Sequence, residues 1–380
     1  MRKKITIAIF CAILFGFTAI SILKPDTEIS ERENRVLETM PEIVLDDILD
    51  GTFQETFETY ISDQFFLRDS WVDLTTGLQT FLGKKDINGV YIGENGYLIE
   101  KYTEEDFDEE IVENNIDVLA AFLNEMTEEY GSDHVDFLTV PSKACAMPDL
   151  LPAWAEGYPE EEITEALCDL LDEPEIYLDL TETLQEHQDE YIYYRTDHHW
   201  TTLGAYYAYA AFAERKGYEV PSLDSYEIET AADDFYGTTY NKLHQNVEPD
   251  TVELYHSEAE ENVTVDMNDG ETVSDSFYFF DELEESDKYR IFFAGNTEKI
   301  VITTAADTGR TLLMLKDSYA NCFVPFLAGE YDTIILYDLR YAGDTIDVLL
   351  DEYGEEITDV LVLYNVEKFM EDESIDLLSY

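Results

Sequence analysis

The sequence predicts an α/β fold in which a mostly parallel β-sheet is flanked by helices. From about Glu110 onward, short apolar runs that are typical of strands alternate with stretches of helical periodicity. Strands that alternate with helices form parallel sheets whose two faces are both covered. The chain of 380 residues, 45% of them hydrophobic, is long enough to bury a large core.

The N-terminal residues, 1–24, have the pattern of a signal anchor. Arg2, Lys3 and Lys4 precede an apolar run from Ile5 to Leu23. A run of about 19 apolar residues spans a bilayer as one helix, and its positively charged end stays in the cytoplasm. We therefore expect an exported, extracytoplasmic body that this helix anchors to the cell membrane. Cleavage as a signal peptide is the alternative, and it would release a secreted protein.

Residues 25–109 form a predicted N-terminal entry module. Its stretch from Phe53 to Leu82 has helical periodicity. Two short strands are expected between Asn88 and Ile99. Glu94-Asn95-Gly96 connects them, because Asn-Gly is a strong signal for a hairpin turn.

Residues 110–380 form the predicted α/β domain. Its expected elements are helix 111–130, strand 134–140, helix 161–171, strand 176–180, strand 191–194, helix 204–216, strand 311–316, a helix from 319, strand 333–337, helix 345–353 and strand 360–364. Residues from about 220 to 310 break this alternation, because they are polar and acidic with scattered aromatic residues. We expect them to form a β-rich insertion beside the sheet.

Acidic side chains dominate the composition. The 86 Asp and Glu residues far exceed the 22 Lys and Arg residues, and the net charge is −64. This charge repels the phosphates of nucleic acids and the headgroups of anionic lipids. We therefore expect no nucleic-acid partner, and contact with the membrane through the N-terminal helix only. The four cysteines show neither a CxxC pattern nor the spacing of metal ligands, and we expect no cofactor.

The tetrad Asp197-His198-His199-Trp200 carries an acid and a base of the kind used in acyl transfer. Asp197 and His199 are two residues apart, so on an extended chain both face one way and His198 faces the other. A carboxylate that holds one imidazole nitrogen leaves the other nitrogen to take the proton of a serine. A metal site is the alternative, but the remaining four histidines are scattered. Trp200 is either a core residue or a wall of the substrate site.

Ser318 is the candidate nucleophile. It follows the apolar strand 311–316 and precedes a helix. Ligands of α/β sheets bind at the carboxyl ends of strands, and the free N–H groups of a helix N-terminus can hold an oxyanion. The alternative is that Ser318 only caps the helix. Cys145 also follows a strand, so a cysteine–histidine hydrolase is a further alternative.

The chain resembles the DHHW family of exported bacterial proteins, named for the tetrad at Asp197 to Trp200. The resemblance covers nearly the whole chain after the anchor. Its other motifs are Glu31-Arg32-Glu33-Asn34-Arg35, Asp63-Gln64-Phe65 and Arg68-Asp69 in the run from Tyr60 to Trp71, Gly83-Lys84-Lys85, Asn88-Gly89-Val90-Tyr91, Lys316-Asp317-Ser318-Tyr319-Ala320-Asn321, Pro325-Phe326-Leu327 and Asp338-Leu339-Arg340-Tyr341.

The family is similar to the SGNH-type proteins of periplasmic alginate O-acetylation, in which an acid-x-His motif precedes the serine. The resemblance implies an SGNH-hydrolase-like fold and a triad of Asp197 as acid, His199 as base and Ser318 as nucleophile. Ordinary SGNH enzymes also use a Gly and an Asn in the oxyanion hole. Gly295 and Asn296 are the candidate counterparts beside the Ser318 backbone, and an ordinary Gly-Asn turn is the alternative.

The expected activity is that of an extracytoplasmic O-acyltransferase that passes an acetyl group to a cell-surface polysaccharide. We expect Trp200 and Tyr319 to form walls of its substrate site. A membrane-bound O-acyltransferase is the implied acyl donor, because anchored relatives are associated with such proteins. An esterase that removes the same groups stays open, since it would use the same acyl-enzyme. A non-catalytic scaffold that binds glycan or assists assembly also stays open.

Overall fold

The computed structural model describes residues 2–30, 35–155, 157–243 and 247–379. The motif residues Glu31 to Asn34 lie outside the described residues. The chain divides into two compact units. The first runs from the N-terminus to Asn88 and includes a short segment that begins at Tyr240. The second consists of Gly89–Thr239 and of the chain from Val247 onward.

The first unit is mainly helical. Its elements are α1 (Arg2–Leu23), β1 (Ile29–Ser30), β2 (Arg35–Val36), α2 (Leu45–Asp50), α3 (Thr52–Asp63), α4 (Arg68–Phe81) and β3 (Asp86–Ile87). The predicted N-terminal helix is present as α1, and the ring centroids of Phe17 and Trp71 lie 5.8 Å apart. Among the described residues, no helix combines the length and the apolarity needed to cross a membrane, so the predicted anchor finds no support there. The helical stretch predicted over 53–82 consists of two helices, α3 and α4.

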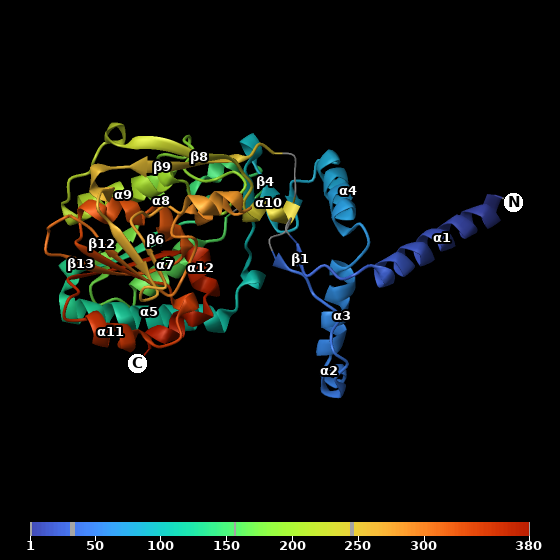
Figure 1. Ribbon diagram of the computed structural model, residues 1–380, viewed down its shortest axis with the longest axis horizontal. Coiled ribbons are helices and arrows are strands. Elements are labelled where there is room, and N and C mark those ends of the chain that lie inside the picture. Colours follow the sequence, from blue (N-terminus) through green and yellow to red (C-terminus); the bar gives the residue numbers. More distant parts are fainter. Residues whose placement is uncertain (1, 31–34, 156, 244–246, 380) are drawn as a thin grey trace. The chain divides into compact units, whose positions relative to one another are not determined.

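Eight of the described strands of the second unit build one sheet, of which Figure 1 labels β6, β12 and β13. The order of its strands is β11-β10-β12-β14-β13-β15-β6-β7. Its strands are β6 (Val135–Val140), β7 (Tyr177–Asp179), β10 (Thr264–Met267), β11 (Thr272–Ser274), β12 (Lys299–Thr303), β13 (Thr311–Lys316), β14 (Thr333–Tyr337) and β15 (Asp359–Asn365). The strands from β14 to β7 run parallel to one another. β12, β10 and β11 continue the sheet in antiparallel pairs. The α/β class with a mostly parallel sheet is therefore confirmed.

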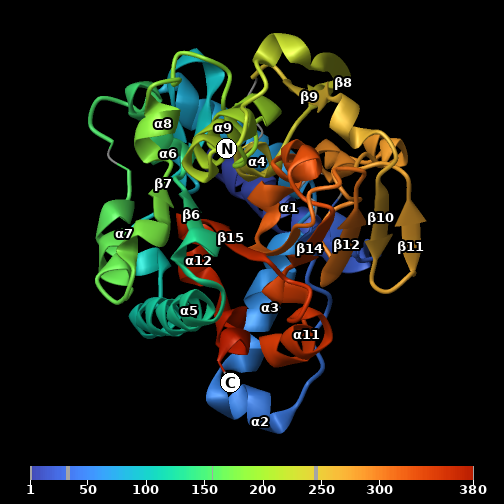
Figure 2. The ribbon, with the colours of Figure 1, turned by 90° about the vertical axis from the view of Figure 1, so that its left-hand side faces the viewer.

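Helices cover both faces of this sheet (Figure 2). The described helices of the second unit are α5 (Glu109–Tyr130), α6 (Lys143–Ala146), α7 (Glu160–Cys168), α8 (Thr181–Gln185), α9 (Thr202–Lys216), α11 (Ile346–Tyr353) and α12 (Val366–Glu371). A further helix, α10 (Thr238–Leu243), begins in the second unit and continues into the segment that belongs to the first. Alternate residues of β13 face opposite sides: Leu312 and Met314 join the core under α9, whereas Leu313 and Leu315 join the core under α5 and α11. Both faces of the strand are apolar because both are buried.

Most predicted elements coincide with observed ones, and two do not. The predicted hairpin is present as β4 (Val90–Ile92) and β5 (Leu98–Glu100), which pair in antiparallel. The strand predicted at 191–194 is reduced to one bridge between Tyr193 and Trp200. The helix predicted from 319 consists of 3₁₀ turns, η10 (Ser318–Cys322) and η11 (Val324–Gly329), in which Pro325 lies at an N-terminal position.

The β-rich insertion predicted at about 220–310 lies only partly beside the sheet. β8 (Glu227–Phe235) and β9 (Asp250–His256) do form a separate antiparallel pair. β10, β11 and β12, by contrast, are strands of the main sheet itself. The apolar residues Ile300 and Ile302 of β12 lie opposite Leu336 and Ile334 of β14, so the sheet core continues into the insertion.

Candidate active site

Ser318 lies two residues after the end of β13, at the carboxyl end of a central strand, and begins η10. The preceding residue, Asp317, fixes its position. One carboxylate oxygen of Asp317 accepts the N–H of Tyr319 at 2.9 Å, and the other accepts the N–H of Asn365 at 2.8 Å. Because Asn365 ends the neighbouring strand β15, Asp317 links the carboxyl ends of β13 and β15 next to the serine.

Ser318, His199 and Asp197 converge, although 119 residues separate the serine from the histidine. The Ser318 Oγ lies 2.7 Å from the His199 Nε2, and the His199 Nδ1 lies 2.6 Å from the Asp197 Oδ1. The serine is 8% exposed and the histidine 7%, so the site is close to the surface but largely shielded from water. These are the distances of a serine–histidine–acid relay.

The hydrogen bonds of Asp197 determine the tautomer of His199. An ionised carboxylate only accepts hydrogen bonds, so the imidazole proton must lie on Nδ1. The Nε2 lone pair then faces the Ser318 hydroxyl, where it can accept the hydroxyl proton. Asp197 also accepts the backbone N–H of His199 at 3.0 Å, which fixes the orientation of the carboxylate.

The other oxygen of Asp197 is held by a residue that the sequence did not point to. Thr238 donates its N–H at 2.8 Å and its hydroxyl at 3.1 Å to the Asp197 Oδ2. A Cβ at the adjacent Gly237 would lie 2.2 Å from the Cβ of Asp197, so glycine is required there. Burial by itself would raise the pKa of Asp197, but His198, His199 and the hydrogen bonds from His199 lower that pKa well below its usual value.

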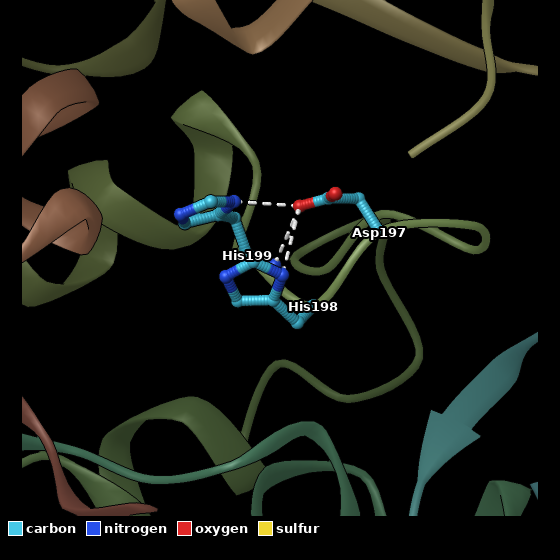
Figure 3. Close-up of side chains that lie close together, drawn as sticks. All are labelled: Asp197, His198 and His199. Atoms are coloured by element: carbon cyan, nitrogen blue, oxygen red, sulfur yellow. Dashed lines mark hydrogen bonds and ion pairs between the residues drawn. The ribbon is translucent and has the colours of Figure 1, made fainter. Parts of the chain in front are cut away.

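Figure 3 shows that the rings of both histidines point toward Asp197. The expectation that His198 faces away from Asp197 is therefore wrong, because residues 195–199 form bends instead of an extended strand. The His198 Nδ1 lies 2.6 Å from the Thr238 Oγ1 and 3.7 Å from the Asp197 Oδ1. Burial and the adjacent His199 lower the pKa of His198 to about 3, so this ring is neutral at pH 7.

Tyr289 supports two members of the triad, and sequence reasoning missed it. Its ring stacks on the ring of His199, with centroids 4.0 Å apart and planes 13° apart. Its hydroxyl donates to the backbone oxygen of Ser318 at 3.0 Å. Tyr289, like Thr238, comes from the stretch predicted as an insertion, where a tyrosine among many aromatic residues gives no signal of its own.

The two residues expected in the oxyanion hole, Gly295 and Asn296, differ in their hydrogen bonds. The N–H of Gly295 already donates to the backbone oxygen of Phe292 at 3.1 Å. Asn296 lies beside the serine helix, where its Oδ1 accepts hydrogen bonds from Lys316 at 2.9 Å and from Asn321 at 3.1 Å. The amide nitrogen of Asn296 therefore points away from Lys316.

Trp200 and Tyr319 are packed in the core, with exposed fractions of 0% and 2%. The Trp200 Nε1 donates to the backbone oxygen of Tyr319 at 2.8 Å, and the Tyr319 hydroxyl donates to the backbone oxygen of His198 at 2.8 Å. Such burial does not fit the expected role of open substrate walls. Both side chains instead fasten the tetrad to the serine helix.

The alternative of a metal site fits the geometry less well than the relay does. Asp197, His198 and His199 offer three ligand atoms within 4.8 Å of one another. In tetrahedral zinc sites with bonds of 2.0–2.1 Å, neighbouring ligand atoms lie roughly 3.3 Å apart. The 2.6 Å between the His199 Nδ1 and the Asp197 Oδ1 is too short for this and matches a hydrogen bond.

The alternative of a cysteine nucleophile is not supported. Burial and the carboxylate of Glu160 raise the pKa of the Cys145 thiol above its usual value. A raised pKa removes the thiolate that a nucleophile needs. The Cys145 Sγ lies 3.2 Å from the backbone oxygen of Tyr158 and lines a cavity of about 760 Å³ at the ends of β6 and β7.

Comparison with known proteins confirms the resemblance to the DHHW family. The model of the family described as "DHHW protein" matches residues 175–337, which include the tetrad and Ser318. A DHHW family protein from Eubacterium siraeum DSM 15702 is 28% identical, with a TM-score of 0.62 over 77% of this chain and 95% of that protein. No curated protein matches the sequence.

Two structures of PatB1 from Bacillus cereus, one of them with a sulfonyl adduct, have the same fold. Each has a TM-score of 0.60 at 21% identity over 75% of this chain, and the alignments cover 96% and 98% of PatB1. The O-acetyltransferase domain of AlgJ from Pseudomonas putida matches with a TM-score of 0.46 at 14% identity, over 76% of this chain and 98% of that domain. The α/β fold of this chain is therefore similar to that of PatB1.

Proposed function

We propose, on the premise of the confirmed resemblance to the DHHW family, that this chain is an O-acyltransferase that works outside the cytoplasm. The single observation that carries the proposal is the relay from Ser318 through His199 to Asp197, with distances of 2.7 and 2.6 Å. The substrate class is the hydroxyl groups of a cell-surface polysaccharide, and the transferred group is acetyl. A membrane-bound O-acyltransferase is the proposed source of the acyl group.

The proposed reaction has two steps, acylation of Ser318 and transfer of the acyl group to a sugar. The Ser318 Oγ attacks the carbonyl carbon of an acyl donor while the His199 Nε2 takes the hydroxyl proton, and His199 then returns that proton to the leaving group. A sugar hydroxyl next attacks the carbonyl carbon of the Ser318 ester and loses its proton to the His199 Nε2. The bond between that carbon and the Ser318 Oγ breaks, His199 passes the proton back to the Oγ, and the sugar leaves O-acetylated. Asp197 stabilises the imidazolium that forms in each step, because its carboxylate is ionised and bonded to Nδ1.

The N–H of Ser318 is the first proposed donor to the oxyanion, since Ser318 begins a 3₁₀ helix. The amide nitrogen of Asn296 is the second, because the carbonyl end of that side chain is already bonded to Lys316 and Asn321. The carbonyl oxygen of the acyl donor would point between these two donors.

The test supplies an acetyl ester and an oligosaccharide acceptor and measures O-acetylated sugar by mass spectrometry. We expect transfer by the wild type and none by Ser318→Ala. Ser142→Ala is the matched control, because Ser142 also follows a strand and caps a helix, α6, with its hydroxyl on the N–H of Cys145. Free acetate without acetylated sugar would identify an esterase instead. Equal behaviour of the wild type and Ser318→Ala would favour a non-catalytic scaffold.

A further inference from the structure

Lys316 is a buried lysine that the relay does not use. It ends β13 two residues before the nucleophile, and its exposed fraction is 0%. Burial lowers the pKa of Lys316, and the carboxylate of Asp338 acts against that shift. A buried ammonium is costly unless each of its N–H groups has an acceptor. The acceptors around the ammonium of Lys316 therefore show what stabilises it in the core.

The ammonium of Lys316 has three acceptors, one for each N–H. Its Nζ lies 2.9 Å from the Asn296 Oδ1, 2.9 Å from the Asn321 Oδ1 and 3.4 Å from the Asp338 Oδ2. Asp338 is itself held by Arg340, whose Nε and Nη2 donate to the two carboxylate oxygens at 2.8 and 2.6 Å. The lysine is thus clamped between the ends of β13 and β14.

The contact with Lys316 determines which way Asn296 points. An ammonium can only donate, so the atom that faces it must be the amide oxygen. Asn321 fills the second lone pair of that oxygen with its Nδ2 at 3.1 Å. The –NH₂ end of Asn296 therefore points away from Lys316.

The position of Asn321 shows on which side of η10 the Asn296 side chain lies. Ser318 and Asn321 are three residues apart in the 3₁₀ helix η10, where side chains at positions i and i+3 lie on one side. Asn296, which bonds to Asn321, lies on the side of η10 that carries the serine.

The turn that presents Asn296 is strained. Phe293, Ala294 and Gly295 have φ values of 59°, 53° and 103°, and left-handed φ values are unfavourable for Phe and Ala. Strained backbone persists where the surroundings hold it, and it is common at functional sites. Here the hydrogen bonds from Lys316 and Asn321 hold the residue at the end of the turn.

We infer that Lys316 is a positioning residue, which orients Asn296 so that the asparagine amide donates to the oxyanion. This inference rests on the proposed function, because it needs an acyl intermediate on Ser318. Lys316 would act only through Asn296 and would touch neither the acyl donor nor the sugar.

The first test is Asn296→Asp, measured with a chromogenic acetyl ester. A carboxylate would accept the same hydrogen bonds from Lys316 and Asn321, so we expect the thermal unfolding temperature to be kept or raised. It would place an acceptor where the oxyanion needs a donor. We therefore expect kcat to fall by about 10²–10³-fold, with little change in KM. Wild-type kcat in this variant would overturn the inference.

The second test is a double-mutant cycle with Lys316→Met and Asn296→Ala. We expect Lys316→Met to lower kcat by about tenfold or more in the wild-type background and to have no further effect in Asn296→Ala. Equal losses in both backgrounds would show a merely structural role and would overturn the inference. Lys216→Met is the matched control, because Lys216 is a shielded lysine paired with Asp136 at 2.9 Å. This control should leave kcat unchanged.

The same assay separates this inference from the proposed function. If Ser318→Ala still forms an acyl-enzyme or turns over the ester at the wild-type rate, the proposed function fails. If Ser318→Ala is inactive while Asn296→Asp is fully active, only the role of Lys316 and Asn296 fails. If Lys316→Met does not fold, Asn296→Asp can still overturn the inference. That variant keeps its contacts with Lys316, and it tests whether the amide of Asn296 donates to the oxyanion.

Discussion

Replacing Asp197 by asparagine tests the relay at its most constrained residue. The carboxylate of Asp197 accepts four hydrogen bonds: the His199 Nδ1 and N–H at 2.6 and 3.0 Å, and the Thr238 N–H and hydroxyl at 2.8 and 3.1 Å. An asparagine has one acceptor oxygen, so its –NH₂ group must face a backbone N–H in either orientation. The substitution changes no volume and leaves the surrounding side chains in place.

The expected magnitudes follow from these four contacts. If the –NH₂ group of Asp197→Asn faces His199, the Nδ1 must become an acceptor, and the proton moves to Nε2, where it blocks proton transfer from Ser318. General-base assistance of this kind contributes roughly 10²–10⁴-fold, so we expect the acylation rate to fall by about 10³-fold. If the –NH₂ group faces Thr238, a buried N–H is left without a partner, at a cost of about 1–3 kcal/mol.

The assay is the rate of acylation by a chromogenic acetyl ester, together with the free energy of unfolding. Asp136→Asn is the matched control, because Asp136 is an equally buried carboxylate that pairs with Arg215 at 2.8 Å. This control should lose stability but keep the acylation rate. Acylation by Asp197→Asn within threefold of the wild type, with no loss in the free energy of unfolding, would refute the assigned role of Asp197.

Three further predictions concern residues around the relay. Tyr289→Phe removes the hydrogen bond to the backbone oxygen of Ser318 at 3.0 Å. One such bond contributes about 0.5–1.5 kcal/mol, so we expect acylation to be roughly 2–10-fold slower, and an unchanged rate would contradict this. The pKa of His198 is lowered to about 3, so the unfolded state binds more protons below pH 6.5, and stability falls as the pH falls. Urea unfolding should show that the free energy of unfolding falls by about 2 kcal/mol less between pH 7 and pH 5 in His198→Gln than in the wild type, and equal decreases would argue against a neutral ring. Gly237→Ala should reduce both the unfolding temperature and acylation, because its Cβ would meet Asp197 at 2.2 Å; normal activity would show that the backbone adjusts.

The sequence predicted the parallel part of the fold well because its signals are local. Uninterrupted apolar runs such as 311–316 and 333–337 are buried on both faces, and they coincide with β13 and β14. The antiparallel strands β10 to β12 escaped prediction as members of the sheet. Their pairing with β14 depends on a match between distant segments, to which a local polar composition gives no clue.

The candidate site shows the same division. Asp197, His199 and Ser318 could be named from residue type, spacing and family resemblance, and the structure brings them together. Thr238 and Tyr289 could not, because each acts through contacts that only the folded insertion creates. His198 was misplaced for a local reason: the alternation of an extended chain was assumed where the chain bends.

The central claim is that Ser318 carries the acyl group, and the most direct measurement is the intact mass of the full-length protein after brief exposure to an activated acetyl ester. The account predicts one added acetyl group, located on Ser318 by peptide mapping, a slow appearance of the same adduct in His199→Ala, and none in Ser318→Ala. An adduct of equal amount in Ser318→Ala, or its location on another residue, would contradict the account.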